Sequence, residues 1–231
     1  MPTLALIRFC MQSQNNLELR SNIVFDLDGT LIDSAPSILQ CLQTVVEKNG
    51  YLADVKFDST LIGPPLRDTL KKLTKEQHQE KLDALVEDFK CEYDQGTCNL
   101  AKPYFGILTL LVDLKMASKN IYIVTNKRYH PTKQIISHLG WANLIDNIYT
   151  IDYPSKRFRE KSQVIHQLLL DFSLKKEGTC YIGDRHEDWA AAATNGLSFI
   201  HVAWGYGPDD GVGLGLHSVK SPDQLRNLLI G

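Results

Sequence analysis

Two aspartates one residue apart follow a short apolar run near the start of the chain. Asp26 and Asp28 come directly after Ile23–Phe25, and Gly29-Thr30 follows at once. The run predicts a buried strand, and residues i and i+2 of a strand share a face. Two ionised carboxylates that close repel each other unless a cation or a proton lies between them. The pattern favours a divalent metal site with one Asp as nucleophile and one as acid or base, over an ordinary acidic turn.

Two further segments supply groups that suit a phosphoryl ligand. Thr125-Asn126 follows the apolar run Ile121–Val124, where a hydroxyl and the next backbone N–H can hold a phosphoryl oxygen, although Thr-Asn is also common at strand ends by chance. Lys161 opens a predicted helix and can balance a carboxylate and a phosphoryl charge as a compact cation. A solvated surface lysine is the alternative, and Lys156, Arg157 and Arg159 compete for the role.

The last polar segment repeats the logic of the first. Tyr181-Ile182-Gly183 ends in Asp184, and Asp188 follows four residues later. Carboxylate oxygens are hard ligands that suit Mg²⁺, which takes few protein carboxylates and keeps its waters. Asp184 is the expected direct ligand, and Asp188 is either a second ligand or a partner of the first.

Strands and helices alternate around these segments. Apolar runs predict strands, and helical patterns lie between the later ones, which implies right-handed crossovers and a parallel sheet with helices on both faces. The expected strands are 23–25, 121–124, 148–151, 179–182 and 198–203, and the expected helices are 106–118, 130–139, 161–172 and 188–195. In such sheets ligands bind beyond the carboxyl ends of the strands, where Asp26 would lie.

Residues 34–102 interrupt the alternation with a helical pattern and no convincing central strand. Helices are expected over 38–49, from Pro64-Pro65, and over 75–91. We interpret this block as a lid over the site, with simple packing on the sheet as the alternative. Residues 1–21 are expected to extend outside the fold, and the glycine-rich stretch 205–215 to form a mobile surface loop without a dinucleotide site.

Composition excludes several classes of protein. The 231 residues carry a net charge of −2, so nothing attracts the chain as a whole to nucleic acid or an anionic membrane. No run has the length of a membrane helix, and the apolar opening makes a poor signal peptide. The five cysteines are widely spaced and favour reduced thiols in a cytoplasmic protein.

The four segments together resemble the motifs of the haloacid dehalogenase superfamily, across residues 23–196. The chain most resembles the phosphoglycolate phosphatase and pyrophosphatase-like branch with a small helical cap. The resemblance implies an α/β fold, a doubly wound parallel sheet with a Rossmannoid core, and a small inserted α-helical cap. The implied domains are residues 1–21 as an extension, 22–33 with 103–231 as the core, and 34–102 as the cap.

The same resemblance implies a role for each residue. Asp26 is the nucleophile that forms an aspartyl-phosphate, and Asp28 is the general acid and base. Mg²⁺ is held by Asp26, the backbone carbonyl of Asp28 and Asp184, with Asp188 in direct contact or behind it. The implied phosphate-binding residues are Gly29, Thr30, Thr125, Asn126 and Lys161. One departure is Ser162, which stands where the family usually has a proline after its lysine.

The implied activity is Mg²⁺-dependent hydrolysis of a small, phosphoglycolate-like phosphomonoester by a monomer or homodimer. A β-phosphoglucomutase-like isomerase has the same four motifs and stays open, because the cap decides between the two. A pyrophosphatase, a phosphonate hydrolase and a non-enzymatic binding protein are less favoured. Within the cap, Arg67 is the candidate for clamping a second anionic group of the substrate. Its alternative is a solvated arginine paired with Asp68.

Overall fold

The computed structural model describes residues 20–58, 61–62, 65–154, 156–207 and 217–231. The chain divides into two compact units. Unit 1 holds the residues up to Asp33 together with Pro103–Gly231, and unit 2 holds Ser34–Lys102. Of the expected N-terminal extension, residues 1–19 lie outside the described part. Arg20 is buried and its guanidinium donates to Ser198 Oγ over 3.1 Å.

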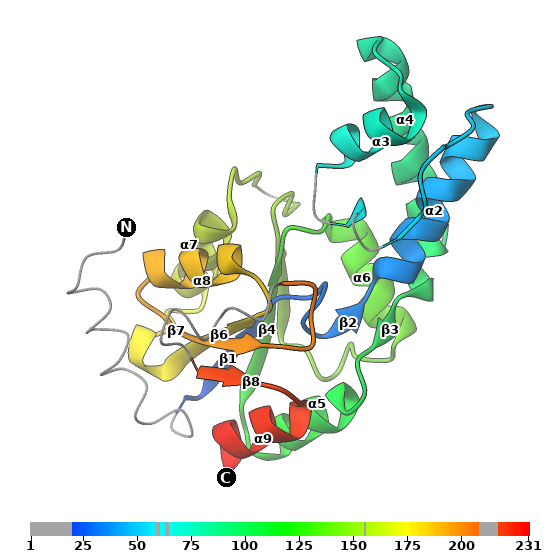
Figure 1. Ribbon diagram of the computed structural model, residues 1–231. Coiled ribbons are helices and arrows are strands. Elements are labelled where there is room, and N and C mark those ends of the chain that lie inside the picture. The colour runs from blue at the N-terminus through cyan, green and yellow to red at the C-terminus, as the bar shows by residue number, and fades with distance from the viewer. Residues whose placement is uncertain (1–19, 59–60, 63–64, 155, 208–216) are drawn as a thin grey trace. The chain divides into compact units, whose positions relative to one another are not determined.

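Unit 1 is built on a six-stranded sheet in which all paired strands are parallel (Figure 1). The strand order is β5-β4-β1-β6-β7-β8. The strands are β1 (Asn22–Phe25), β4 (Asn120–Thr125), β5 (Asn147–Thr150), β6 (Thr179–Gly183), β7 (Ser198–Val202) and β8 (His217–Val219). Because β1 lies between β4 and β6, the strand order reverses there, and the carboxyl ends at such a switch point form a crevice.

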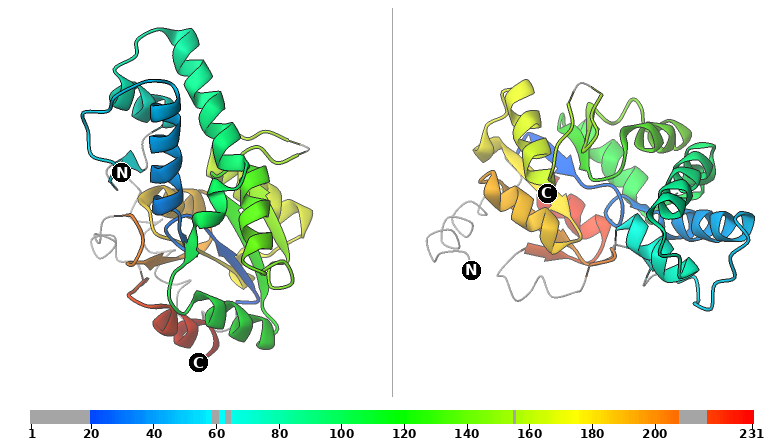
Figure 2. Two further views of the ribbon diagram at one scale, coloured as in Figure 1. Left: turned by 90° about the vertical axis from the view of Figure 1, so that its right-hand side faces the viewer. Right: turned by 90° about the horizontal axis from the view of Figure 1, so that it is seen from above.

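Helices cover both faces of this sheet, which confirms the doubly wound α/β prediction. They are α5 (Ile107–Met116), α6 (Tyr129–His138), α7 (Lys161–Asp171), α8 (His186–Thr194) and α9 (Pro222–Ile230). One face, which carries Val24 and Tyr181, packs against apolar residues of α7 and α8 such as Leu168 and Ala192. Helices α5 and α9 lie side by side on the other face (Figures 1 and 2).

The chain continues beyond the strand that was expected to be the last. Strand β8 follows β7 and pairs with it, and α9 closes the chain. The start of α9 has an ordinary capping signal, because the Ser221 hydroxyl accepts from Gln224 N over 3.2 Å and Pro222 is the first helical residue. The expectation that β7 ends the sheet is therefore wrong.

Unit 2 is helical, as expected for the segment between β1 and β4. It contains α2 (Ala35–Lys48), α3 (Leu66–Thr74), α4 (Gln79–Asp94) and the short 3-10 helix η3 (Thr97–Leu100). Buried residues of α2 and α4 form its core, among them Leu42, Val46, Leu85 and Phe89. Pro65 is the N-cap of α3, whereas Pro64 lies outside the described residues.

The prediction that a helix begins at Lys75 is wrong. Lys75 adopts a left-handed conformation with φ 57° and ends α3. The Glu76 carboxylate then accepts from the backbone N–H groups of Gln77 and His78 at 2.8 and 2.9 Å. This local turn delays the start of α4 to Gln79.

The two segments that connect the units pair with each other. β2 (Ile32–Asp33) and β3 (Lys102–Pro103) form a two-stranded sheet, and Tyr104 N donates to Leu31 O over 3.2 Å. In the part of the chain that the structure describes, no helix is long and apolar enough to cross a membrane.

Candidate active site

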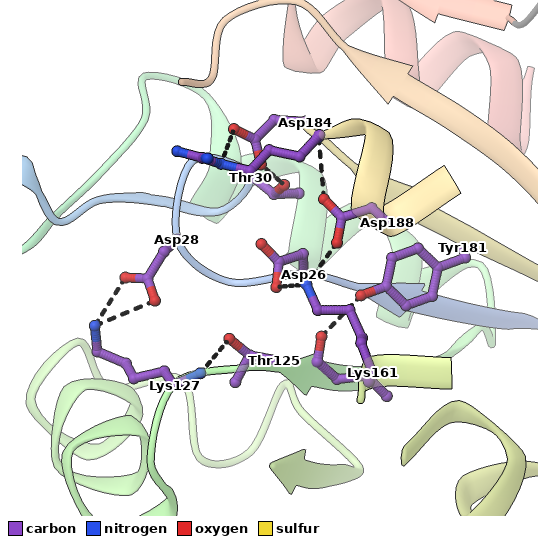
Figure 3. Close-up of polar contacts among 11 residues, drawn as sticks. Asp26, Asp28, Thr30, Thr125, Lys127, Lys161, Tyr181, Asp184 and Asp188 are labelled. Carbon is purple, nitrogen blue, oxygen red and sulfur yellow. Dashed lines mark hydrogen bonds and ion pairs between the residues drawn. The ribbon is translucent and has the colours of Figure 1, made fainter. Parts of the chain in front are cut away.

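The candidate site lies at the carboxyl ends of β1, β4 and β6, the three central strands. Asp26 follows β1, Thr125 ends β4, and Asp184 follows β6. Asp26 N donates to Ile182 O over 2.9 Å, so the backbone of Asp26 stays in register with β6. The sheet topology therefore brings together residues that lie between 59 and 158 positions apart in the sequence (Figure 3).

Three buried carboxylates meet at this edge. Asp26, Asp184 and Asp188 each offer one oxygen, and these oxygens lie within 4.8 Å of one another. Burial raises the pKa of Asp26 to about 8, against the lowering effect of Lys161. Burial also raises the pKa of Asp184, and the nearby Asp188 adds to that. The cluster has more negative charge than its surroundings compensate, which makes it a candidate site for a cation.

One lysine serves two of these carboxylates. Lys161, the first residue of α7, places Nζ 2.8 Å from Asp26 Oδ1 and 2.5 Å from Asp188 Oδ1 (Figure 3). Although burial opposes its charge, Asp188 and Asp26 raise the pKa of Lys161 well above its usual range. The competing Lys156 instead donates to Gln167 Oε1 over 2.9 Å.

The oxygens of Asp188 are both engaged. Asp188 Oδ1 accepts from Lys161, and Oδ2 accepts from Arg185 N over 3.1 Å at the start of α8. Asp188 therefore fixes the position of Lys161 and closes the first turn of its own helix.

Backbone groups hold Asp184. Its Oδ2 accepts from Tyr206 N at 2.8 Å and from Gly207 N at 3.2 Å, and its Oδ1 faces Thr30 Oγ1 at 3.4 Å. The prediction of a mobile glycine-rich loop is therefore wrong for the residues 205–207, which dock on the site. Residues 208–216 lie outside the described part of the chain.

Glycines allow this close approach. Gly29 has φ +85°, and a Cβ on Gly29 would collide with the Asp184 carboxylate. A Cβ on Gly205 or Gly207 would also collide with Asp184, and one on Gly183 would collide with Asp188. The site is packed so tightly around its carboxylates that only glycine fits at these four positions.

Of the residues expected to bind phosphate, two have their polar groups engaged elsewhere. Gly29 N donates to Ile32 O over 2.9 Å, and Thr30 N donates to Leu27 O over 3.3 Å. Conversely, the N–H groups of Leu27 and Asp28 have no acceptor among the described residues. Buried backbone N–H groups without partners are rare in folded proteins, and such groups suit an anion. The N–H groups of Leu27 and Asp28 are therefore better candidates for binding a phosphoryl group than those of Gly29 and Thr30.

Thr125 and Asn126 lie where the sequence predicts. The buried Thr125 Oγ1 accepts from Lys127 N over 3.2 Å, so its hydroxyl hydrogen remains for another acceptor. Asn126 lines a cavity of 390 Å³ together with Lys161, Arg159 and residues of α8.

Asp28 has a cation of its own, which the sequence reasoning missed. Lys127 Nζ lies 2.9 Å from Asp28 Oδ1 and 3.2 Å from Oδ2 (Figure 3). Asp28 follows β1 and Lys127 follows β4, and the two side chains meet because these strands are parallel neighbours, which the sequence alone does not show.

Arg67 belongs to unit 2 and is bound there. Its guanidinium pairs with Asp83 and donates to Gln79 Oε1 over 2.7 Å. These partners belong to α4, and Asp68 is not the ion-pair partner. A role for Arg67 in substrate binding stays a prediction.

The chain is similar to known proteins over most of its length. A sequence model described as haloacid dehalogenase-like hydrolase matches residues 23–202. A phosphoglycolate phosphatase of Aquifex aeolicus is 30% identical over 186 residues, 80% of this chain and 85% of that protein. The tyrosine-protein kinase PtkA of Mycobacterium tuberculosis is 28% identical over 189 residues, 81% of this chain, which spans only 64% of the kinase.

A solved structure agrees with these matches. The haloacid dehalogenase-like hydrolase SP0104 from Streptococcus pneumoniae has a TM-score of 0.77 and 25% identity, covering 90% of this chain and 97% of that one.

Proposed function

Because the chain belongs to the haloacid dehalogenase-like hydrolases, we propose that it is a Mg²⁺-dependent phosphatase acting on a small phosphomonoester. The observation that carries the proposal is the buried group of Asp26, Asp184 and Asp188, in which Lys161 pairs with Asp26 and Asp188. The similarity to the phosphoglycolate phosphatase of Aquifex aeolicus supports phosphatase activity and a small, anionic substrate.

The donor set fits Mg²⁺. Asp26 Oδ2 has no hydrogen-bond partner among the described residues, and Asp184 Oδ1 has only the 3.4 Å contact with Thr30. Asp26, Asp184 and the backbone carbonyl of Asp28 would hold the ion. Both oxygens of Asp188 are engaged, so we assign it to Lys161 and not to the metal. Bound Mg²⁺ offsets the negative charge of the carboxylates and the phosphoryl group.

In the proposed mechanism, residues of the chain make the nucleophilic attack, transfer the protons and bind the phosphoryl group. Asp26 attacks phosphorus, the bond from phosphorus to the leaving oxygen breaks, and an aspartyl-phosphate forms. Asp28 gives a proton to the leaving oxygen and then takes one from the water that hydrolyses the intermediate. Lys161, the Thr125 hydroxyl and the N–H groups of Leu27 and Asp28 hold the phosphoryl oxygens.

We propose that unit 2 acts as a cap and determines substrate specificity. We retain Arg67 as a candidate for binding a second anionic group of the substrate, because guanidinium binds carboxylates in a bidentate manner. Arg67→Ala should then lower kcat/KM for phosphoglycolate by at least about tenfold and leave 4-nitrophenyl phosphate almost unchanged, since one charged hydrogen bond is worth about 1.5–3 kcal/mol. Equal losses on both substrates would remove Arg67 from the binding site.

The experiment that tests the function is phosphate release from a panel of small phosphoesters, with and without Mg²⁺. We expect release from an alkyl phosphomonoester such as phosphoglycolate, dependent on the ion. Hexose 1-phosphate is included as a diagnostic, because isomerisation without release would indicate a mutase. Failure to turn over any phosphomonoester with Mg²⁺ would contradict the proposal.

A further inference from the structure

The Asp28 carboxylate is held by Lys127, whereas a different lysine holds Asp26 and Asp188. Lys127 Nζ contacts both Asp28 oxygens, whereas Lys161 contacts Asp26 and Asp188. The Lys127 side chain is 8% exposed and that of Asp28 is 25% exposed. Two different lysines thus contact the proposed nucleophile, Asp26, and the proposed proton carrier, Asp28.

The backbone fixes the origin of the Lys127 side chain. Lys127 N donates to Thr125 Oγ1, so the turn after β4 is tied to the same hydroxyl that faces the phosphoryl site. β1 and β4 are paired in parallel with Phe25 opposite Ile123. Both residues of the ion pair therefore follow the ends of adjacent parallel strands.

We propose that Lys127 is a positioning residue that orients the Asp28 carboxyl group for proton transfer to the leaving group. This inference rests on the proposed function, in which Asp28 is the general acid. A carboxyl group can rotate about its last bonds, and contact with both of its oxygens restricts that rotation. When one oxygen carries the proton, the ammonium keeps its hydrogen bond to the other, so the orientation is retained in both states.

The test uses the leaving group as the reporter. The kcat/KM value covers the steps up to departure of the leaving group, and a phosphate with a poor leaving group needs the acid most. We expect Lys127→Met to lower kcat/KM about 100-fold for phosphoglycolate, an alkyl ester, and less than about 5-fold for 4-nitrophenyl phosphate, at saturating Mg²⁺. Lys127→Arg, which keeps a cation, should recover most of the loss on the alkyl ester.

Two controls separate positioning from other roles. Lys133→Met removes an exposed lysine on α6 and should leave both substrates unchanged. The double variant Lys127→Met/Asp28→Asn should be within about threefold of Asp28→Asn alone, since residues acting through one group are not additive. Thermal unfolding checks that each variant is folded, and Lys127→Gln is measured on the same substrate pair if Lys127→Met does not fold.

Each outcome separates this inference from the proposed function. If Asp28→Asn loses activity selectively on the alkyl ester but Lys127→Met loses it equally on both, Lys127 has a structural or substrate-binding role and the positioning role is overturned. Multiplicative losses in the double variant would overturn it too. If Asp28→Asn shows no selectivity, the acid assignment of Asp28 fails and this inference fails with it, while the metal site and nucleophile stand.

Discussion

Two acidic side chains, one in each unit, are almost equally shielded from solvent, but their pKa values are shifted in opposite directions. Asp26 in unit 1 is 5% exposed and Glu76 in unit 2 is 9% exposed. Burial raises the pKa of Asp26 to about 8. Hydrogen bonds, first the one from the backbone of His78, hold the pKa of Glu76 well below its usual range.

The difference lies in the number of donors. Glu76 accepts from Tyr51 OH at 2.8 Å, from the backbone N–H groups of Gln77 and His78, and contacts the His78 ring, so its charge is fully hydrogen-bonded. Asp26 has one donor, Lys161, and two acidic neighbours. Burial alone therefore does not identify a functional carboxylate, whereas a buried carboxylate with too few donors beside others of its kind indicates a missing ligand.

The largest expected effect is a loss of activity on substitution of Asp26 but not of Glu76. Asp26→Asn removes the nucleophile and keeps its shape, so phosphate release should fall by at least about a thousandfold. The melting temperature should not fall, because the change also removes a poorly compensated charge. The matched change Glu76→Gln should retain turnover. Substantial residual turnover in Asp26→Asn would contradict the covalent mechanism.

A smaller loss is expected at the neighbouring aspartate. Asp28→Asn keeps the nucleophile and removes the proton carrier, so kcat should fall by about a hundredfold, the usual scale of general acid–base catalysis. Steady-state phosphate release at saturating substrate measures it. A loss as deep as that of Asp26→Asn would mean that Asp28 does more than carry a proton.

Metal binding should also distinguish the carboxylates of the site from Glu76, and it can be measured without an activity assay. Mg²⁺ at one hundred times its dissociation constant should stabilise the folded protein by about 2.7 kcal/mol, which appears as a higher melting temperature. Asp184→Asn should abolish the shift, whereas Glu76→Gln should retain it. An equal shift in Asp184→Asn would place the ion elsewhere.

The smallest effect concerns stability and pH in unit 2. Because the folded-state pKa of Glu76 is depressed, its contribution is fully present above its ordinary pKa of 4.5 and is lost as the pH falls below that value. The melting temperature of wild type should therefore exceed that of Glu76→Gln at pH 7, and the gap should narrow between pH 4.5 and pH 3. A difference in melting temperature that does not change with pH would mean that the shape of the Glu76 side chain, rather than its charge, stabilises the protein.

The central strands and the site residues at their ends could be predicted because each signal is local. An apolar run that stops at Asp26, Thr125 or Asp184 shows both the strand and the polar group after it in a few consecutive residues. Lys161 could be predicted as the opening residue of a helix for the same reason.

The features that could not be predicted from the sequence depend on groups that are far apart along the chain or that no side-chain type identifies. The N–H groups of Tyr206 and Gly207 bind Asp184, and no residue type announces a backbone donor. Lys127 meets Asp28 only because β1 and β4 are neighbours, which the order of strands along the chain does not fix. The start of α4 was misplaced because Lys75 takes up a left-handed turn without glycine.

The pairing of β2 with β3 means that the chain leaves and re-enters unit 1 at adjacent points. A segment whose two ends are fixed side by side can be exchanged for another of different length, because closing the junction costs little extra entropy. If unit 2 determines substrate preference as proposed, we expect that exchange of residues 34–102 between relatives changes that preference in one step and leaves the residues of the proposed site in unit 1 unchanged. A chimera that carries a relative's segment between Asp33 and Pro103 should fold and acquire that relative's choice of substrate.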